Sequence, residues 1–155
     1  MAHEIPVRCF AVSAVIMVEG AEKPEVLLLK RACSYLPGEW CHVAGCIEEG
    51  ESASTAILRE IVEESGLKVS RLFSADYCEQ FYEPDKDGIS VVPVFVAYVF
   101  PDQEVVLNEE NSEYRWVSFE KAKEMVPFGG QRSLYDFVYQ EFVLKTPSRW
   151  LKIKT

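Results

Sequence analysis

Three glutamates and one arginine are concentrated in a single short stretch of the chain, residues 59–64. At about 100° per residue in a helix, Glu60, Glu63 and Glu64 fall within one narrow arc. Like charges four residues apart destabilise a helix by roughly a few tenths of a kcal/mol per pair, and Arg59 neutralises only part of the cluster. Convergent carboxylate oxygens are the ligands that a hard divalent cation such as Mg²⁺ takes. These residues alone leave two interpretations open, a Mg²⁺ site and a solvated acidic face.

The helix that carries these residues is expected to begin after Ser52 as N-cap, to end at Ser65, and to stop at Gly66. Small side chains at Ala53 and Ala56 are expected on its acidic side, where they leave room for a ligand. The buried face is expected to consist of the aliphatic residues Ile57, Leu58, Ile61 and Val62.

A longer pattern contains this helix. Gly45 is followed after five residues by Glu51, and after seven more by Arg59-Glu60-Ile61-Val62-Glu63-Glu64-Ser65-Gly66-Leu67. Every specified position of the Nudix box is filled, G-x5-E-x7-R-E-U-x-E-E-x-G-U with U a bulky aliphatic residue. A chance match is rarer than about one in a million at average residue usage. The chain therefore resembles the Nudix hydrolase family over residues 45–67, and the order of elements around the box also resembles that family.

The resemblance implies a metal site and names its residues. Glu60 and Glu64 correspond to metal ligands, and Glu63 to a further ligand that binds directly or through water. The backbone carbonyl of Ala44, just before the box glycine, is similar to a metal-binding carbonyl of the family. The implied cofactor is Mg²⁺, with Mn²⁺ as the expected substitute.

The resemblance also implies residues that act beside the metal. Arg59 resembles the residue that orients the glutamates, with Glu51 as its partner. The implied reaction is attack of water at phosphorus, for which a glutamate removes a proton. Glu63 is one candidate for this base. Glu110 resembles a loop glutamate that assists in several members, and a simple exposed acidic loop is the alternative interpretation of that residue.

The substrate is less well defined by the sequence. Residues 40–45, Tyr114-Arg115-Trp116 and Gln131-Arg132 resemble the dihydroneopterin triphosphate and dATP pyrophosphatase branch. A nucleoside triphosphate or related triphosphate is therefore the leading substrate class. The alternatives are ADP-ribose or a dinucleoside polyphosphate, and a non-catalytic domain that senses nucleotides. Candidates for stacking on a substrate ring, with core packing as the alternative, are Tyr35, Trp40, Phe81 and Tyr82. Lys30 and Arg31 are expected either to meet phosphates or to be solvated.

Composition narrows the class of protein. The 155 residues are expected to form one domain, residues 1–155, and the net charge of −9 argues against binding to long nucleic acids. No apolar run is long enough to cross a membrane and no secretory signal is evident, so a cytoplasmic protein is expected. The five cysteines are expected to be buried reduced thiols rather than a zinc site. A homodimer is an open alternative that the sequence does not establish.

Strands and helices alternate along the chain, which predicts an α/β fold with a mixed sheet. The resemblance specifies an α/β/α sandwich. Strands are expected at 7–18, 26–29, 69–81, 89–100 and 114–117, and a short extended piece at 40–44. Helices are expected at 52–65, at 118–125 with Ser118 as N-cap, and across 134–142, where apolar residues recur at helical spacing. The segment 149–154 alternates and is expected to be an edge strand or a subunit contact.

Overall fold

The computed structural model describes residues 1–155, which form two sheets and the helices that cover them. The larger sheet has the strand order β5-β2-β7-β6-β9, with β1 pairing to β7. β2 runs parallel to β7, whereas the β2–β5, β6–β7 and β6–β9 pairs are antiparallel, so the sheet is mixed. Its strands are β1 (Val7–Arg8), β2 (Ala11–Val18), β5 (Val43–Cys46), β6 (Val69–Glu83), β7 (Gly88–Val99) and β9 (Lys152–Ile153).

The smaller sheet is antiparallel and has the order β4-β3-β8. Its strands are β3 (Glu25–Arg31), β4 (Trp40–Cys41) and β8 (Asn111–Ser118). The pairing of β3 with β8 shifts register between Lys30 and Arg31, where Arg31 lies opposite Asn111. The first residue of β8 therefore lies at the end of β3. Glu110, directly before β8, is held at the same place, because its carbonyl accepts a hydrogen bond from the Ala32 amide at 2.8 Å.

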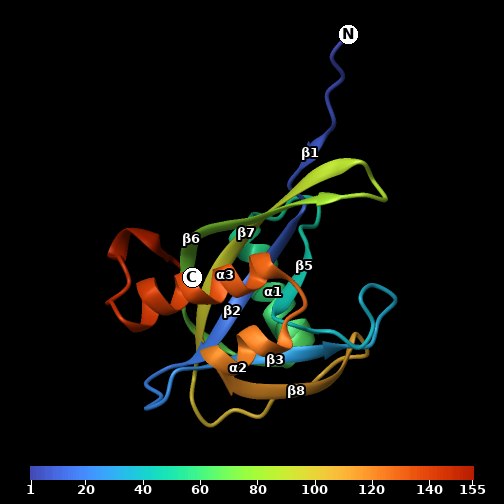
Figure 1. The fold of residues 1–155 in the computed structure, drawn as a ribbon. Coiled ribbons are helices and arrows are strands. Elements are labelled where there is room, and N and C mark those ends of the chain that lie inside the picture. The colour runs from blue at the N-terminus through green and yellow to red at the C-terminus, as the bar shows by residue number, and fades with distance from the viewer.

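The helices lie on both faces of the larger sheet, so the α/β/α sandwich with a mixed sheet is confirmed (Figure 1). β2 is buried on both faces, as a nearly continuous apolar strand is expected to be. Ala14 and Ile16 pack into the cluster that contains α1, and Val15 and Met17 into the cluster that contains α3. The helices are α1 (Ala53–Ser65), α2 (Phe119–Met125) and α3 (Gly129–Val138), followed by the π-helical turn η1 (Tyr139–Val143) and the 3-10 turn η2 (Arg149–Leu151).

The expected caps of α1 are confirmed. Ser52 Oγ accepts a hydrogen bond from the Thr55 amide at 3.1 Å. Gly66 has a φ of 69°, in the left-handed region, and its amide donates to the Val62 carbonyl at 2.9 Å. Ser118 caps α2 in the same way as Ser52, with the Lys121 amide as donor at 3.1 Å. Local sequence therefore set where both helices begin.

The predicted faces of α1 were wrong at two positions, Val62 on the expected buried face and Ala56 on the expected acidic side. Val62 is 57% exposed, and Ala56 is fully buried in the core rather than on an open acidic side. Glu60 and Glu64 are buried instead, together with Ile57 and Ile61. The helix is thus rotated so that two of its carboxylates face the protein. An apolar pattern alone does not reveal this rotation, because a glutamate is normally assigned to the solvent side.

The predicted strand over 7–18 is two strands. β1 pairs with Ile89 and Ser90 of β7, and β2 pairs with β7 from Val94 onward, so the chain between them departs from the sheet. The edge strand predicted over 149–154 is confirmed only at Lys152–Ile153, where β9 pairs with β6 at Leu72 and Phe73. Residues Arg149–Leu151 form a 3-10 turn instead.

All five cysteines are free thiols, but their predicted burial was largely wrong. Cys41 is buried, whereas Cys9, Cys46 and Cys78 are exposed and Cys33 is half-buried. Cys9 lies between β1 and β2, Cys46 is the last residue of β5, and Cys78 lies in β6 where its pairing with β7 shifts register, so apolar character did not ensure burial. No helix in the structure is both long and apolar enough to span a bilayer.

Candidate active site

Three carboxylates from two distant segments meet beside α1. Glu60 and Glu64 come from the helix, and Glu110 comes from the residue directly before β8. One oxygen from each lies within 4.8 Å of those of the other two. Glu60 and Glu64 are only 8% and 4% exposed, whereas Glu110 is exposed. The cluster therefore has a buried floor and one side open to solvent.

Glu64 has an unsatisfied oxygen in this cluster. Asn111 Nδ2 donates to Glu64 Oε1 at 3.1 Å, whereas Oε2 is buried and has no hydrogen-bond partner. Burial, with the neighbouring Glu110 and Glu60 charges, raises the pKa of Glu64 to about 8. Asn111 was not among the residues selected from the sequence. The only signal for it was its place next to Glu110.

Glu60 lies directly against Gly45 of β5. A Cβ built on Gly45 would lie 2.1 Å from the Glu60 carboxyl carbon, closer than any real contact. Burial raises the pKa of Glu60, although the adjacent Arg59 opposes this shift. The glycine of the box is therefore required by the close approach of strand and carboxylate. Its φ is not in the left-handed region.

We expect Gly45→Ala to displace the Glu60 carboxylate and to overpack the contact between β5 and α1. Overpacking of this kind costs about 1–3 kcal/mol of folding stability. Gly130→Ala in α3 is the matched control, because a Cβ there meets no atom within 4 Å. Thermal unfolding of the two variants measures the difference. Equal melting temperatures would contradict the assigned contact.

Arg59 gathers the acidic residues around its guanidinium group. Its Nε and Nη2 donate to the two oxygens of Glu51 at 2.8 and 2.9 Å, and Nη2 also donates to the Cys46 carbonyl at 3.0 Å. Its Nη1 donates to Glu60 at 2.8 Å and to Glu63 at 3.2 Å. The Arg59 hydrogen bond, with that from the Glu48 amide, holds the pKa of Glu51 at about 2. Arg59 thus ties the loop after β5 to α1.

We expect Arg59→Lys to lower the affinity for a divalent cation and the turnover by about 10–100-fold, the usual cost of losing a residue that orients metal ligands. Lysine keeps the positive charge, but it lacks the planar guanidinium group that donates two hydrogen bonds to Glu51 and a third to Glu60. Manganese titration and steady-state kinetics measure the two effects. Arg71→Lys is a suitable control, since Arg71 bonds Glu19 on two atoms in the same manner. Equal losses in both variants would argue against a specific role of Arg59.

The carboxylate cluster fits a hard divalent cation. Its donors are oxygens, the ligand type of Mg²⁺, and Glu64 Oε2 is a buried oxygen with no partner within the protein. Glu63 lies outside the cluster, is 51% exposed at its side chain and contacts Arg59. Ala44 immediately precedes the glycine against which Glu60 lies.

The residues considered for substrate contact are distributed more widely. The positive charge of Arg31 lies close enough to Glu64 to oppose the rise in the pKa of Glu64. The Arg31 guanidinium also donates a hydrogen bond to the Tyr35 carbonyl at 2.7 Å. Lys30 instead pairs with Glu113 at 3.1 Å near the surface. Trp40 packs against the core under Arg115. The other three aromatic candidates are exposed, namely Tyr35, Phe81 and Tyr82.

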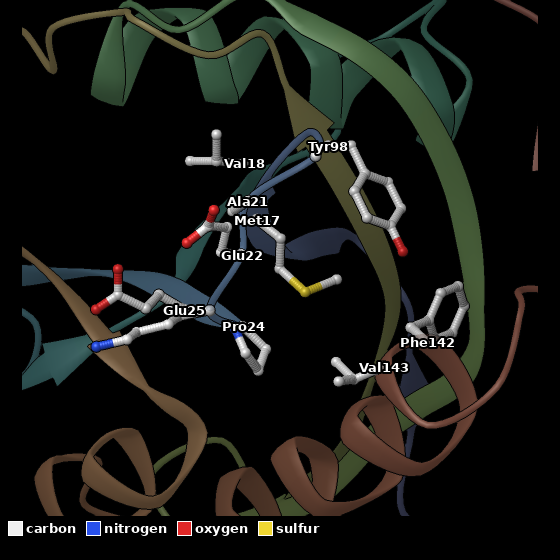
Figure 2. A pocket seen from close by; sticks show the side chains of 11 residues that line it. Met17, Val18, Ala21, Glu22, Pro24, Glu25, Tyr98, Phe142 and Val143 are labelled. Atoms are coloured by element: carbon white, nitrogen blue, oxygen red, sulfur yellow. The ribbon is translucent and has the colours of Figure 1, made fainter.

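A separate hollow of about 260 Å³ lies at the far end of β2, between the turn that follows this strand and the wall formed by Tyr98 and Phe142. Figure 2 shows Met17 reaching into it, with the carboxylates of Glu22 and Glu25 on the side of the turn. None of the three clustered carboxylates lines it. The charged residues of its lining are Glu22, Lys23 and Glu25, and they include no group of three side chains that could hold a metal ion, so the hollow does not compete with the carboxylate cluster as a cation-assisted phosphate site.

Two curated proteins are similar to this chain in sequence. The nucleoside triphosphatase NudI of Klebsiella pneumoniae is 30% identical over 110 residues, which cover 65% of this chain and 78% of that protein. An octanoyltransferase of Myxococcus xanthus is 35% identical over 121 residues, which cover 77% of this chain. The matched region is only 34% of the latter protein's length.

Solved structures give the same fold. An Ap4A hydrolase of C. elegans, in a binary complex, superposes with a TM-score of 0.72 at 27% identity, over 86% of this chain and 96% of its own. The dihydroneopterin triphosphate pyrophosphohydrolase of E. coli superposes with a TM-score of 0.69 at 21% identity, over 92% and 100% of the two chains. The NUDIX domain family matches residues 8–137, which include the box and all three clustered carboxylates. The chain belongs to the Nudix family of hydrolases.

Proposed function

We propose that the protein is a Mg²⁺-dependent pyrophosphohydrolase that cleaves the diphosphate linkage of a nucleoside triphosphate or a related triphosphate. The observation that carries this proposal is the partnerless, buried Oε2 of Glu64, held beside Glu60 and Glu110. A buried carboxylate oxygen with no donor is costly in the metal-free protein. A cation held by Glu60 and Glu64, beside Glu110, would offset that cost and would present positive charge to phosphate oxygens.

The chain's own residues have distinct roles in this proposal. Glu60 and Glu64 would hold the cation, with the carbonyl of Ala44 and with Glu63 as a further ligand. When bound, the cation neutralises charge on the phosphates and lowers the pKa of a water molecule. Arg59, fixed by Glu51, keeps the Glu60 carboxylate turned toward the cluster.

Glu110 is the better candidate for the general base. It is exposed and its carboxylate already belongs to the cluster, so it lies beside the proposed cation site and is open to a water molecule from solvent. Glu63 is the second candidate, but its carboxylate accepts a hydrogen bond from Arg59 at 3.2 Å. Glu110 therefore takes the proton of the attacking water, which adds to phosphorus as the diphosphate leaves.

The triphosphate class is supported by the residues around the cluster. Arg31 places a guanidinium group near Glu64, where it can meet a phosphate. The similarity to a protein named as a nucleoside triphosphatase agrees with this class. A dinucleoside polyphosphate is the second candidate, because the C. elegans structure that shares 27% of its residues is named as an Ap4A hydrolase.

The remaining proposals concern where the protein acts and on what. Its net charge of −9 favours a small substrate, whose charge the cation neutralises, over a nucleic acid polymer. Five free thiols are compatible with a reducing compartment, and we place the protein in the cytoplasm.

A screen of nucleotides tests the proposal. The protein is incubated with nucleoside triphosphates, dihydroneopterin triphosphate, ADP-ribose and dinucleoside polyphosphates, with Mg²⁺, with Mn²⁺ and with chelator. We expect pyrophosphate release from one or more triphosphates, and no turnover with chelator. Cleavage of only the dinucleoside polyphosphates would select the second candidate. No hydrolysis of any of these compounds with either cation would reject the enzyme.

A further inference from the structure

A second polar cluster lies on the face of the larger sheet opposite α1. It joins four segments through the side chains of Ser13 on β2, His42 between β4 and β5, Glu79 on β6 and Tyr135 on α3. Ser13 Oγ donates to Glu79 Oε2 at 3.1 Å, and His42 Nε2 lies 3.5 Å from the same oxygen. The other nitrogen of His42, Nδ1, lies 3.0 Å from the Tyr135 hydroxyl. Glu79 is thus the centre of the cluster.

The cluster is almost completely withdrawn from water. Tyr135, Ser13 and His42 are at most 5% exposed, and the Glu79 side chain is 14% exposed. Burial raises the pKa of Glu79, but His42 and Ser13 lower it by more, so the pKa of this buried carboxyl lies below its usual value. The surrounding layer is otherwise built from apolar residues such as Val15 and Leu134. Burying polar side chains costs more free energy than filling the same space with aliphatic ones. The four polar residues are therefore better explained by their directional contacts, which fix the relative positions of the segments that carry them.

The two groups that Glu79 holds flank one short strand. Ser13 is the cross-strand partner of Ala44 in the pairing of β2 with β5. His42 immediately precedes Val43, the first residue of β5. One carboxylate oxygen therefore binds both the strand beside β5 and the residue that leads into it. Tyr135 fixes the second side of the His42 ring from α3.

On the face of the sheet that carries α1, there is little room for β5 to move. Gly45 touches the Glu60 carboxylate so closely that even one added carbon would lie 2.1 Å from it. A shift of β5 by a few tenths of an ångström toward α1 would displace that carboxylate, and a shift away would separate Ala44 and Gly45 from it. Packing of apolar side chains alone allows small shifts of this kind more readily than directional polar contacts do.

We infer that Glu79 is a positioning residue which, through Ser13 and His42, fixes β5 so that Ala44 and Gly45 lie correctly against Glu60. The inference rests on the proposed function, because it takes the carboxylate cluster to be the cation site. Glu79 touches neither cation nor substrate, and it acts only through the backbone of β5.

Manganese affinity tests this role without any substrate. The dissociation constant of Mn²⁺ is measured by calorimetry for the wild type, Glu79→Leu and Glu79→Gln, and unfolding is followed for each metal-free protein. Glu83→Leu is the matched control. Glu83 lies on the same strand, accepts a bond from Ser90 Oγ at 2.6 Å and has a side chain that is 21% exposed, so its loss tests a similar contact that involves neither Ser13 nor His42.

We expect Glu79→Leu to raise the Mn²⁺ dissociation constant by about 10-fold or more, the scale found for residues that orient metal ligands. Glu79→Gln is expected to raise it less, because its amide oxygen still accepts from Ser13. Glu83→Leu is expected to leave it unchanged. In turnover assays kcat should fall more than KM rises, since the cation site rather than the substrate contact is disturbed.

Unchanged Mn²⁺ affinity in Glu79→Leu, with or without a loss of stability, would overturn the inference and leave a purely structural role. If Glu79→Leu does not fold, Glu79→Gln and Tyr135→Phe decide, and wild-type affinity in both would overturn it. Failure of the proposed function would give a different result. In that case the wild type would bind no Mn²⁺, or the Glu64→Gln variant would bind Mn²⁺ as tightly as the wild type does.

Discussion

Glu64→Gln is expected to lower turnover by at least about 100-fold while the protein still folds. Loss of a residue that merely orients metal ligands costs 10–100-fold, and Glu64 is proposed to be a ligand itself. Glutamine retains the shape of the side chain and an oxygen that accepts from Asn111, but its amide nitrogen is a poor ligand for a hard cation. Steady-state kinetics across a range of Mg²⁺ concentrations measures the loss.

Two further variants make the result specific. Glu124→Gln removes a carboxylate from the exposed face of α2, and we expect full activity from it. Glu64→Gln is expected to bind Mn²⁺ weakly in the absence of substrate, which separates loss of the cation from loss of substrate contact. Full turnover of Glu64→Gln at low Mg²⁺ would reject Glu64 as a ligand.

Raising the pH from about 4.5 to about 8 is expected to destabilise the metal-free protein. The folded state holds the pKa of Glu64 at about 8, above the ordinary 4.5, mainly because the carboxyl is buried. Between these values the folded protein keeps a proton that the unfolded chain has released, so the free energy of unfolding falls as the pH rises. At roughly 1.4 kcal/mol per pH unit, the loss amounts to a few kcal/mol. Burial raises the pKa of Glu60 as well, which acts in the same direction.

Glu51 does not obscure this effect. Its pKa is held at about 2, so its contribution to stability is lost only as the pH falls from about 4.5 toward 2. A divalent cation is expected to reverse the loss at pH 8, because it takes the place of the proton, and its affinity is expected to rise with pH up to that value.

Chemical denaturation at several pH values, with and without Mg²⁺, measures the slope. Glu64→Gln has no proton to lose and should flatten most of it, so that the variant is more stable than the metal-free wild type at pH 8. A wild-type slope that is unchanged by this substitution would show that the effect arises elsewhere.

The box in the sequence determined much of the site. Its seven fixed residues and two aliphatic positions, from Gly45 to Leu67, specified the family, the helix that carries the glutamates, and the pairing of Arg59 with Glu51. The caps at Ser52 and Gly66 were predictable because a cap is a local interaction between neighbouring residues. β2 was predictable as a buried strand because its apolar run is continuous.

The rotation of α1 was decided only by the tertiary structure. Helical periodicity places Val62 near Ile61, yet Val62 is 57% exposed and Glu60 is buried. The side chain that a helix buries depends on the surface against which it packs. Here that surface is β5, where Gly45 leaves room for a carboxylate that any other residue would exclude.

The contacts between distant segments were likewise beyond the sequence. Glu110 and Asn111 reach Glu64 because β8 pairs with β3 in a register that brings Arg31 opposite Asn111. Glu79 meets Ser13 and His42 because the larger sheet and the loop before β5 bring residues 13, 42 and 79 together. Sequence by itself determined the residues that do chemistry and the local structure that carries them. Strand register and packing, which depend on pairings between residues far apart in the chain, decided which of those residues meet.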